Sequence, residues 1–249
     1  MKSAIVGISY NEKKNVNWTK LWAGQLRRFL PDETIVMVDH NNIEKEHQLC
    51  AKYDIKVIKN NNKTKTHGAG VDAAAAWCRA NGITTMIHIE PDVAIYGRNW
   101  FDKMILAIEK GYWVSGMFQR AYCPKILHGS VSAWNLDRCK HSFMLQPKMH
   151  DLYDKSYIDL IDERTIYEIW GKHSLTHIKF FLYNWDMGDK NWFEAYKSNK
   201  YFKIESNDCV HMWRSSFQDP LDRLLEEEIH QRQSTQKTKV DERFLKLVK

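Results

Sequence analysis

Hydrophobic and polar positions alternate in blocks along the first 120 residues, where short apolar runs are separated by longer amphipathic stretches. The apolar runs predict strands over residues 4–9, 34–38, 55–58 and 84–95. The amphipathic stretches predict helices over residues 17–29, 43–53, 70–81 and 99–110. Strands that alternate with helices are typical of an α/β fold with a mostly parallel central sheet flanked by helices.

The second half of the chain is less regular. A strand-like stretch over 201–205 leads to the segment CVHMWR, and residues 216–249 predict a C-terminal helix with a charged tail. Neither a repeat nor a Pro/Gly-rich linker separates the two halves. We therefore expect residues 1–120 and 121–215 to be two halves of one domain.

Polar residues stand at the ends of three predicted strands. Residues 9–12 follow the first strand, Asp39 ends the second, and Glu90 and Asp92 flank Pro91 within the apolar stretch 84–95. The carboxyl ends of parallel strands lie at one edge of the sheet, where ligands bind in open α/β folds. Carboxylates suit hard cations such as Mg²⁺ or Mn²⁺, which also accept phosphate oxygens as ligands. An ordinary acidic turn is the alternative for Glu90 and Asp92, but the convergence of three strand ends favours a metal site.

Composition and charge limit the class of protein and the cell compartment in which this site could occur. A chain of 249 residues that is 43% hydrophobic can bury one substantial core or two small ones. The net charge of +6 allows an anionic partner, and the five scattered cysteines, without a C-x-x-C pair, argue against a structural zinc site. No apolar run is as long as a membrane span, and no signal-peptide pattern opens the chain. These features predict a soluble, cytoplasmic protein.

Five segments follow one another along the chain: VGISYNE, VMVDHN, HGAGVDAAAA, IHIEPDV and a late HMW. Their order resembles that of the GT-A fold glycosyltransferases, in particular members similar to family 2. The resemblance covers about residues 3–120 well and continues more loosely to about residue 214. It implies a metal-dependent glycosyltransferase that uses a nucleotide-diphosphate sugar, with a UDP-sugar favoured and Mn²⁺ or Mg²⁺ as cofactor. Residues 1–120 would then bind the nucleotide sugar, and residues 121–215 would form the acceptor side.

Carried over to this sequence, the resemblance implies roles for the strand-end residues. The nucleotide base and ribose would meet the first strand exit, formed by Ser9, Tyr10, Asn11 and Glu12. Asp39 would accept a hydrogen bond from the base imide, which favours uridine. Asp92 would be the main metal ligand, with His211 as a late second ligand. Glu90 stands where the family usually has Asp, so the resemblance gives it a ribose or water-mediated contact.

The segment before the third predicted helix suits a diphosphate. Gly68 and Gly70 would let the backbone approach a ligand at a helix N-terminus, which favours phosphate. His67, with Lys63 and Lys65, would assist at the leaving diphosphate, whose developing charge a metal also neutralises. A plain loop-to-helix turn is the alternative for the two glycines, and a solvated loop is the alternative for the two lysines.

A catalytic base is harder to assign. An inverting transferase needs a carboxylate that removes the proton of the acceptor hydroxyl, and the candidates are Asp186 and Asp189. Asp189 precedes the helix-like stretch NWFEAYKSN, so a helix N-cap is its alternative role. A retaining mechanism would need neither carboxylate.

The acceptor and the activity class stay open at this level. A glycan or small molecule is the default acceptor, and DNA with a hydroxylated base, as in phage DNA-modifying transferases, is a second possibility that the basic charge allows. A nucleotidyltransferase would share the sheet and the acidic site, but it usually has a glycine-rich loop after the first strand, where this chain has SYNEKKN. A non-catalytic nucleic-acid-binding module is the third alternative.

Overall fold

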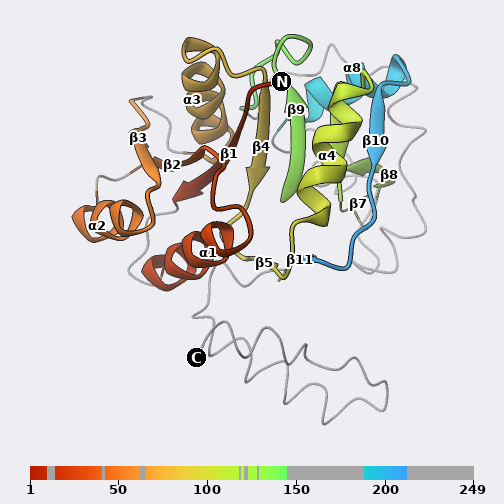
Figure 1. Ribbon diagram of the computed structural model, residues 1–249. Coiled ribbons are helices and arrows are strands. Elements are labelled where there is room, and N and C mark those ends of the chain that lie inside the picture. The colour runs from red at the N-terminus through yellow and green to blue at the C-terminus, as the bar shows by residue number, and fades with distance from the viewer. Residues whose placement is uncertain are drawn as a thin grey trace, which may run out of the picture.

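The computed structural model describes residues 1–9, 15–40, 43–61, 66–117, 119–120, 123–127, 129–144 and 188–211. A seven-stranded sheet crosses the molecule in the order β10-β6-β9-β4-β1-β2-β3 (Figure 1). Its strands are β1 (Ser3–Ser9), β2 (Ile35–Asp39), β3 (Lys56–Lys59), β4 (Thr85–Ile89), β6 (Val114–Gly116), β9 (Val131–Asn135) and β10 (Tyr201–Lys203). Neighbouring strands are parallel except where β9 pairs with β4 and β6. The predicted mostly parallel sheet is confirmed.

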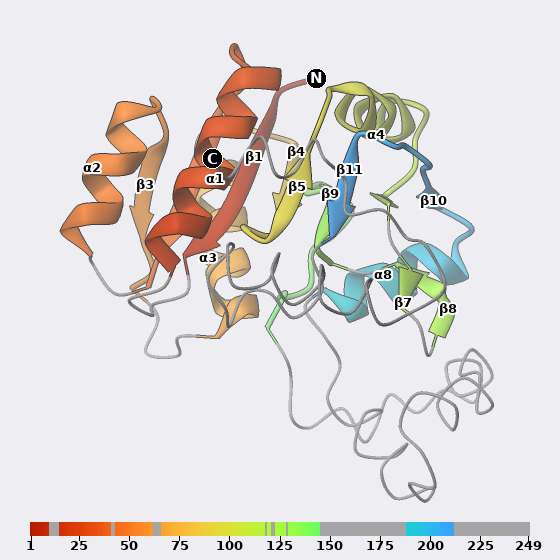
Figure 2. The same cartoon turned by 90° about the horizontal axis from the view of Figure 1, so that it is seen from below.

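Helices cover both faces of this sheet (Figure 2). One face carries α1 (Asn15–Phe29), α2 (Glu44–Lys52) and α4 (Asn99–Glu109), and the other carries α3 (His67–Ala80) and α8 (Asp189–Lys197). A hydrophobic core lies on each face of the sheet, and β1 contributes to both because its side chains alternate between the faces. Ile5 packs with α1, whereas Val6 packs with α3. None of the described helices combines the length and the apolar character of a membrane span.

The apolar stretch 84–95 forms two strands rather than one. Strand β4 ends at Ile89, and β5 (Val93–Ile95) belongs to a separate two-stranded sheet with β11 (Cys209–His211). Between them Val93 N–H donates to Glu90 O at 3.1 Å, which closes a turn around Pro91. Proline has no N–H to continue a strand ladder, so it suits this break. Glu90 and Asp92 therefore lie in a tight turn between two sheets. A second two-stranded sheet pairs β7 (Gln119–Arg120) with β8 (Cys123–Leu127).

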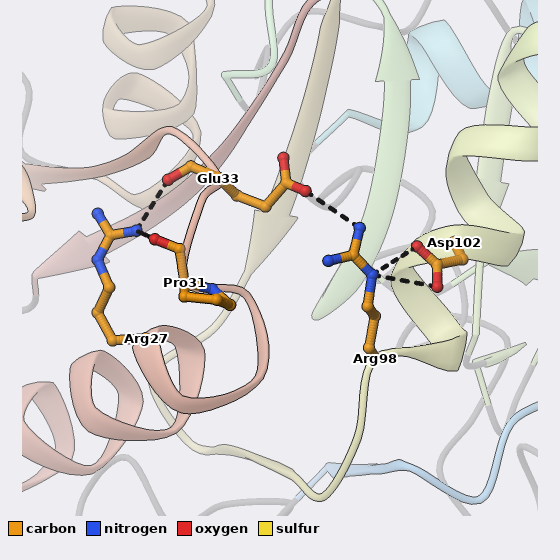
Figure 3. Close-up of polar contacts among 5 residues, drawn as sticks. All are labelled: Arg27, Pro31, Glu33, Arg98 and Asp102. Carbon is orange, nitrogen blue, oxygen red and sulfur yellow. Dashed lines mark hydrogen bonds and ion pairs between the residues drawn. The ribbon is translucent and has the colours of Figure 1, made fainter.

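A chain of surface contacts ties the end of α1 to the start of α4 (Figure 3). Arg27 donates to the carbonyl oxygens of Pro31 and Glu33 at 2.8 and 2.9 Å. The Glu33 carboxylate accepts from Arg98 at 3.3 Å, and Arg98 donates in turn to Asp102 at 2.9 Å. Exposed ion pairs contribute little individually. Together these contacts connect the end of α1 to the residues between β5 and α4.

Candidate functional site

The polar ends of three strands lie at one edge of the sheet. Ser9 and Asp39 are register partners at the ends of β1 and β2. Strand β4 runs parallel to β1 on its other side and ends just before Glu90. The parallel topology thus brings together Ser9, Asp39, Glu90 and Asp92, as their positions after the predicted strands indicated.

Asp92 lies in the turn after β4 and is 5% exposed. Strands β5 and β11 pair in antiparallel register, which sets the backbone of His211 opposite Val93, the neighbour of Asp92. The side chain of His211 lies outside the described part. Within the described residues no three His, Cys, Asp or Glu side chains form a metal-binding group. A carboxylate beside a histidine backbone position fits Mn²⁺ or Mg²⁺ only if phosphate oxygens and water complete the coordination shell.

Gln25 on α1 holds the strand that follows this turn. Its side chain is 2% exposed, and its Nε2 donates to Val93 O at 2.6 Å while its Oε1 accepts from Ile95 N–H at 2.9 Å. Strand β11 pairs with β5 as well, so β5 is held by a side-chain amide and by a strand. Gln25 was not among the predicted site residues. Its available signal was a polar residue on the apolar face of an amphipathic helix.

Two histidines connect the interior of the sheet to Glu90. His67 is the first residue of α3, and its Nε2 lies 2.9 Å from Nε2 of His88, which is fully buried in β4. The other nitrogen of His67, Nδ1, lies 3.7 Å from Oε1 of Glu90. His88 Nδ1 lies 2.8 Å from the carbonyl oxygen of Gly129. His67 was expected near the diphosphate, whereas His88 was missed, because a histidine inside an apolar strand gives no functional signal by itself.

Beneath the ends of β1 and β2 lies a buried carboxyl group, Glu46 of α2, which the sequence analysis also missed. Its carboxyl oxygens accept hydrogen bonds from the hydroxyl groups of Ser9 and, at 3.3 Å, Thr19. Burial raises the pKa of Glu46, the Ser9 hydroxyl opposes that shift, and the negative charge of Asp39 adds to it. The Ser9 hydroxyl is therefore engaged within the protein, at the position predicted to meet the nucleotide.

Asp39 is buried and makes two contacts with the start of α2. Its Oδ2 accepts from Ile43 N–H at 3.1 Å and lies 2.6 Å from His47 Nε2. These contacts orient the carboxyl group at the end of β2. Recognition of a nucleotide base by Asp39 stays a prediction.

The two glycines of α3 have a packing reason within the chain. A Cβ on Gly68 would stand 2.4 Å from the carbonyl oxygen of Phe143, and a Cβ on Gly70 would stand 2.7 Å from Ile8 Cγ2. The absence of side chains thus lets α3 lie close to β1 and to residues 143–144. Helix α3 begins at His67, three residues earlier than predicted, with Thr66 as its N-cap. A contact between these glycines and a ligand stays a prediction.

Asp189 is the first residue of α8, and the N-cap is Gly188, so the N-cap role considered for Asp189 is wrong. Gly188 has φ of 78°, a left-handed conformation that glycine adopts without strain. Its N–H donates to Phe143 O at 3.3 Å, the carbonyl oxygen that also lies against Gly68. The N-terminus of α8, where Asp189 lies, is therefore next to residues 143–144, which pack on the N-terminus of α3.

Several predicted site residues lie outside the described part of the chain. They are Tyr10, Asn11, Glu12, Lys63, Lys65 and Asp186, together with the side chains of Asp189 and His211. The predicted C-terminal helix and tail over 216–249 also lie outside it. Their roles stay predictions.

No protein-family model and no curated protein matches the sequence. Part of the chain is similar to the mannosyltransferase PcManGT from Pyrobaculum calidifontis in complex with GDP-Man and Mn²⁺, at 11% identity over 57% of this chain and 47% of that chain, with a TM-score of 0.46. Part is similar to S. aureus TarS 1–349, at 14% identity over 56% and 48%, with a TM-score of 0.44.

A third similar structure is glucosyl-3-phosphoglycerate synthase from Mycobacterium tuberculosis in complex with Mn²⁺, UDP-Glc and phosphoglyceric acid. It matches at 11% identity over 55% of this chain and 58% of that chain, with a TM-score of 0.43. The chain spans about half the length of these three structures. At such identities the likeness concerns part of the backbone, and no activity of this chain follows from it.

Proposed function

We propose that this protein is a metal-dependent glycosyltransferase that moves a sugar from a nucleotide-diphosphate sugar, with a UDP-sugar favoured, to an acceptor hydroxyl. One observation carries the proposal. Ser9, Asp39 and Asp92 stand at the carboxyl edge of a parallel sheet, and the β11 register sets His211 beside the turn of Asp92. In open α/β sheets this edge is where nucleotides bind.

Each part of the donor has a candidate partner at this edge. Asp39 would accept from the base imide, and Ser9 with residues 10–12 would line the base and the ribose, with Glu90 on the ribose side. Asp92 and His211 would hold Mn²⁺ or Mg²⁺, which when bound neutralises charge on the leaving diphosphate.

The N-terminus of α3 is the proposed diphosphate site. His67, Gly68 and Gly70 form its first turn. The helix dipole favours negative charge at this end of α3. These residues would therefore stabilise the diphosphate as it leaves.

Transfer also needs a group that takes the acceptor proton. We assign this role to Asp186, with Asp189 as the second candidate. As the acceptor oxygen bonds to the anomeric carbon and the bond to the diphosphate breaks, the carboxylate receives the hydroxyl proton. Asp186→Asn is expected to abolish transfer and leave donor binding intact, as measured by turnover and by a thermal shift with UDP. Undiminished turnover would remove Asp186 from the mechanism.

A thermal-shift screen tests the donor and the metal together. UDP, GDP, CDP and TDP are each added with and without Mn²⁺. A ligand at about 100 times its Kd stabilises the fold by about 2.7 kcal/mol, which is visible as a rise in Tm. We expect the largest rise with UDP and Mn²⁺. The absence of a Mn²⁺-dependent rise with every nucleoside diphosphate would overturn the proposal.

Two matched variants test whether Asp92 binds the metal. Asp92→Ala should remove the Mn²⁺-dependent part of the rise. Asp137→Ala is the control, because Asp137 is an exposed carboxylate that follows β9 at the opposite edge of the sheet. A full Mn²⁺-dependent rise in Asp92→Ala would show that the metal assignment is wrong.

The acceptor is tested separately. With a donor identified, transfer is assayed to glycans, to small hydroxyl compounds and to DNA with hydroxymethylated bases. A glycan or small molecule is the proposed acceptor class. DNA as the acceptor would instead appear as transfer together with binding that weakens steeply as salt rises, because phosphate contacts release counterions.

A further inference from the structure

The buried His88 belongs to a directional series of hydrogen bonds. Trp134 Nε1 can only donate, and it does so to Ser132 Oγ at 2.8 Å. Ser132 Oγ then donates its own hydrogen to the carbonyl oxygen of Gly129 at 3.0 Å. All three side chains of the series (Trp134, Ser132 and His88) are at most 2% exposed. The Gly129 carbonyl oxygen is thus held in place in front of His88.

The Gly129 carbonyl determines which nitrogen of His88 carries the hydrogen. A carbonyl oxygen only accepts, so His88 Nδ1, at 2.8 Å, must be the N–H nitrogen. In the neutral ring the other nitrogen, Nε2, is then an acceptor. Nε2 of His67 lies 2.9 Å away, with the two rings edge to face, so His67 must donate from its Nε2.

We infer that His88 is a positioning residue: it holds His67 as the Nε2–H tautomer and turns His67 Nδ1 toward Glu90 at the strand-end edge. Glu90 Oε1 lies 3.7 Å from that nitrogen. Groups that hydrogen-bond the far nitrogen of a metal-ligating histidine fix its tautomer and ring orientation in the same way. The assignment of hydrogens rests on the hydrogen bonds alone, whereas its effect on turnover rests on the proposed function.

The assignment determines how His67 meets a donor substrate. Because Nε2–H of His67 is engaged by His88, the substrate is met through Nδ1. In the neutral ring Nδ1 accepts from a sugar hydroxyl, and in the protonated ring it donates to a phosphate oxygen. Without His88 the ring could rotate or change tautomer, and the same nitrogen would no longer face the site.

The hydrogens are observed directly by NMR of the full protein with ¹⁵N-labelled histidines. Correlations from the ring carbon-bound protons distinguish a protonated from a bare nitrogen, and spectra of His67→Gln and His88→Gln assign the two rings. We expect His88 as the Nδ1–H tautomer and His67 as the Nε2–H tautomer at a pH where both are neutral. His88 with its hydrogen on Nε2, or His67 with its hydrogen on Nδ1, would overturn the inference.

Two variants of His88 separate its two contacts. Asn places an amide near the Nδ1 position and retains a donor for Gly129, but it removes the acceptor for His67. Gln places its amide oxygen near the Nε2 position and retains that acceptor. We expect turnover to fall about 10- to 100-fold in His88→Asn, the range known for groups that orient a metal-ligating histidine, and to fall less in His88→Gln.

A double-mutant cycle distinguishes positioning from a general loss of structure. If His88 acts through His67, His88→Asn has little further effect on turnover in a His67→Ala background. An equal loss in both backgrounds would contradict the inference. Should no donor support turnover at all, the proposed function fails, and the NMR tautomers still confirm or refute the assignment of hydrogens.

Discussion

Glu46 is a buried carboxyl group whose ionisation costs the fold free energy. Burial raises its pKa above 4.5, Ser9 opposes the shift, and Asp39 adds to it. The folded state therefore keeps a proton that the unfolded state releases, so the free energy of unfolding falls as pH rises from about 4.5 through the folded-state pKa. Above that pKa the loss is constant.

Glu46→Gln removes this ionisation; its amide oxygen can still accept from Ser9, and its amide NH₂ can donate to the hydroxyl oxygen of Thr19. We expect the variant to lack that decline, so that its free energy of unfolding relative to the wild type rises as the pH increases above about 4.5. Urea denaturation across this range measures the difference. Glu44→Gln, on the exposed face of the same helix, is the control and should change no such trend. If the free energy of unfolding of Glu46→Gln and of the wild type changed with pH in the same way, a raised pKa of Glu46 in the folded state would be contradicted.

Among the helices and strands, α1 and β5 are joined by Gln25, whose side-chain amide makes two hydrogen bonds to the backbone of β5. Gln25→Leu conserves much of the volume but leaves Val93 O and Ile95 N–H without this partner. Each buried group left unsatisfied costs about 1–3 kcal/mol, so we expect a loss of at least about 2 kcal/mol in urea denaturation. Because β5 follows the turn of Asp92, the Mn²⁺-dependent rise in Tm should shrink as well.

The matched control for this element is Gln48→Leu. Gln48 lies on the exposed face of α2 and contacts Glu44 at 3.2 Å, so the same chemical change there should alter stability by less than about 0.5 kcal/mol. Similar losses in both variants would mean that the two hydrogen bonds to β5 do not stabilise the fold.

At the scale of the whole molecule, the buried cysteines test whether the chain is one domain. Cys50 and Cys209 lie in the core beneath α1, α2 and α4, and Cys78 and Cys139 lie in the core beneath α3 and α8. Burial raises the pKa of Cys50, Cys78 and Cys139 to about 12 and raises that of Cys209 too. The thiolate is the reactive form, so all four should react slowly in the folded protein.

Alkylation in increasing urea, followed by peptide mapping, then reports unfolding at each cysteine. The residue ranges 1–120 and 121–215 contribute two of these cysteines each. One cooperative domain predicts a single urea midpoint for all four. A lower midpoint for Cys139 and Cys209 alone would show that the second half unfolds separately, against the prediction of one domain.

The local part of the candidate site could be predicted because it depends on short-range pattern. Alternating apolar strands and amphipathic helices implied a parallel order, and a parallel order sets Ser9, Asp39 and Glu90 at one edge. The break at Pro91 was less visible, since Val93–Ile95 is as apolar as the strand before it and only its partner strand distinguishes it.

The pattern of apolar and polar residues was enough to predict the α/β class, the strand ends and the residue types found there. The packed fold was needed to show which distant side chains contact one another: Gln25 contacts β5, His88 contacts His67, and Glu46 contacts Ser9. Periodicity indicates which face of an element is buried, whereas a hydrogen bond between residues 21 to 68 positions apart depends on how the elements pack.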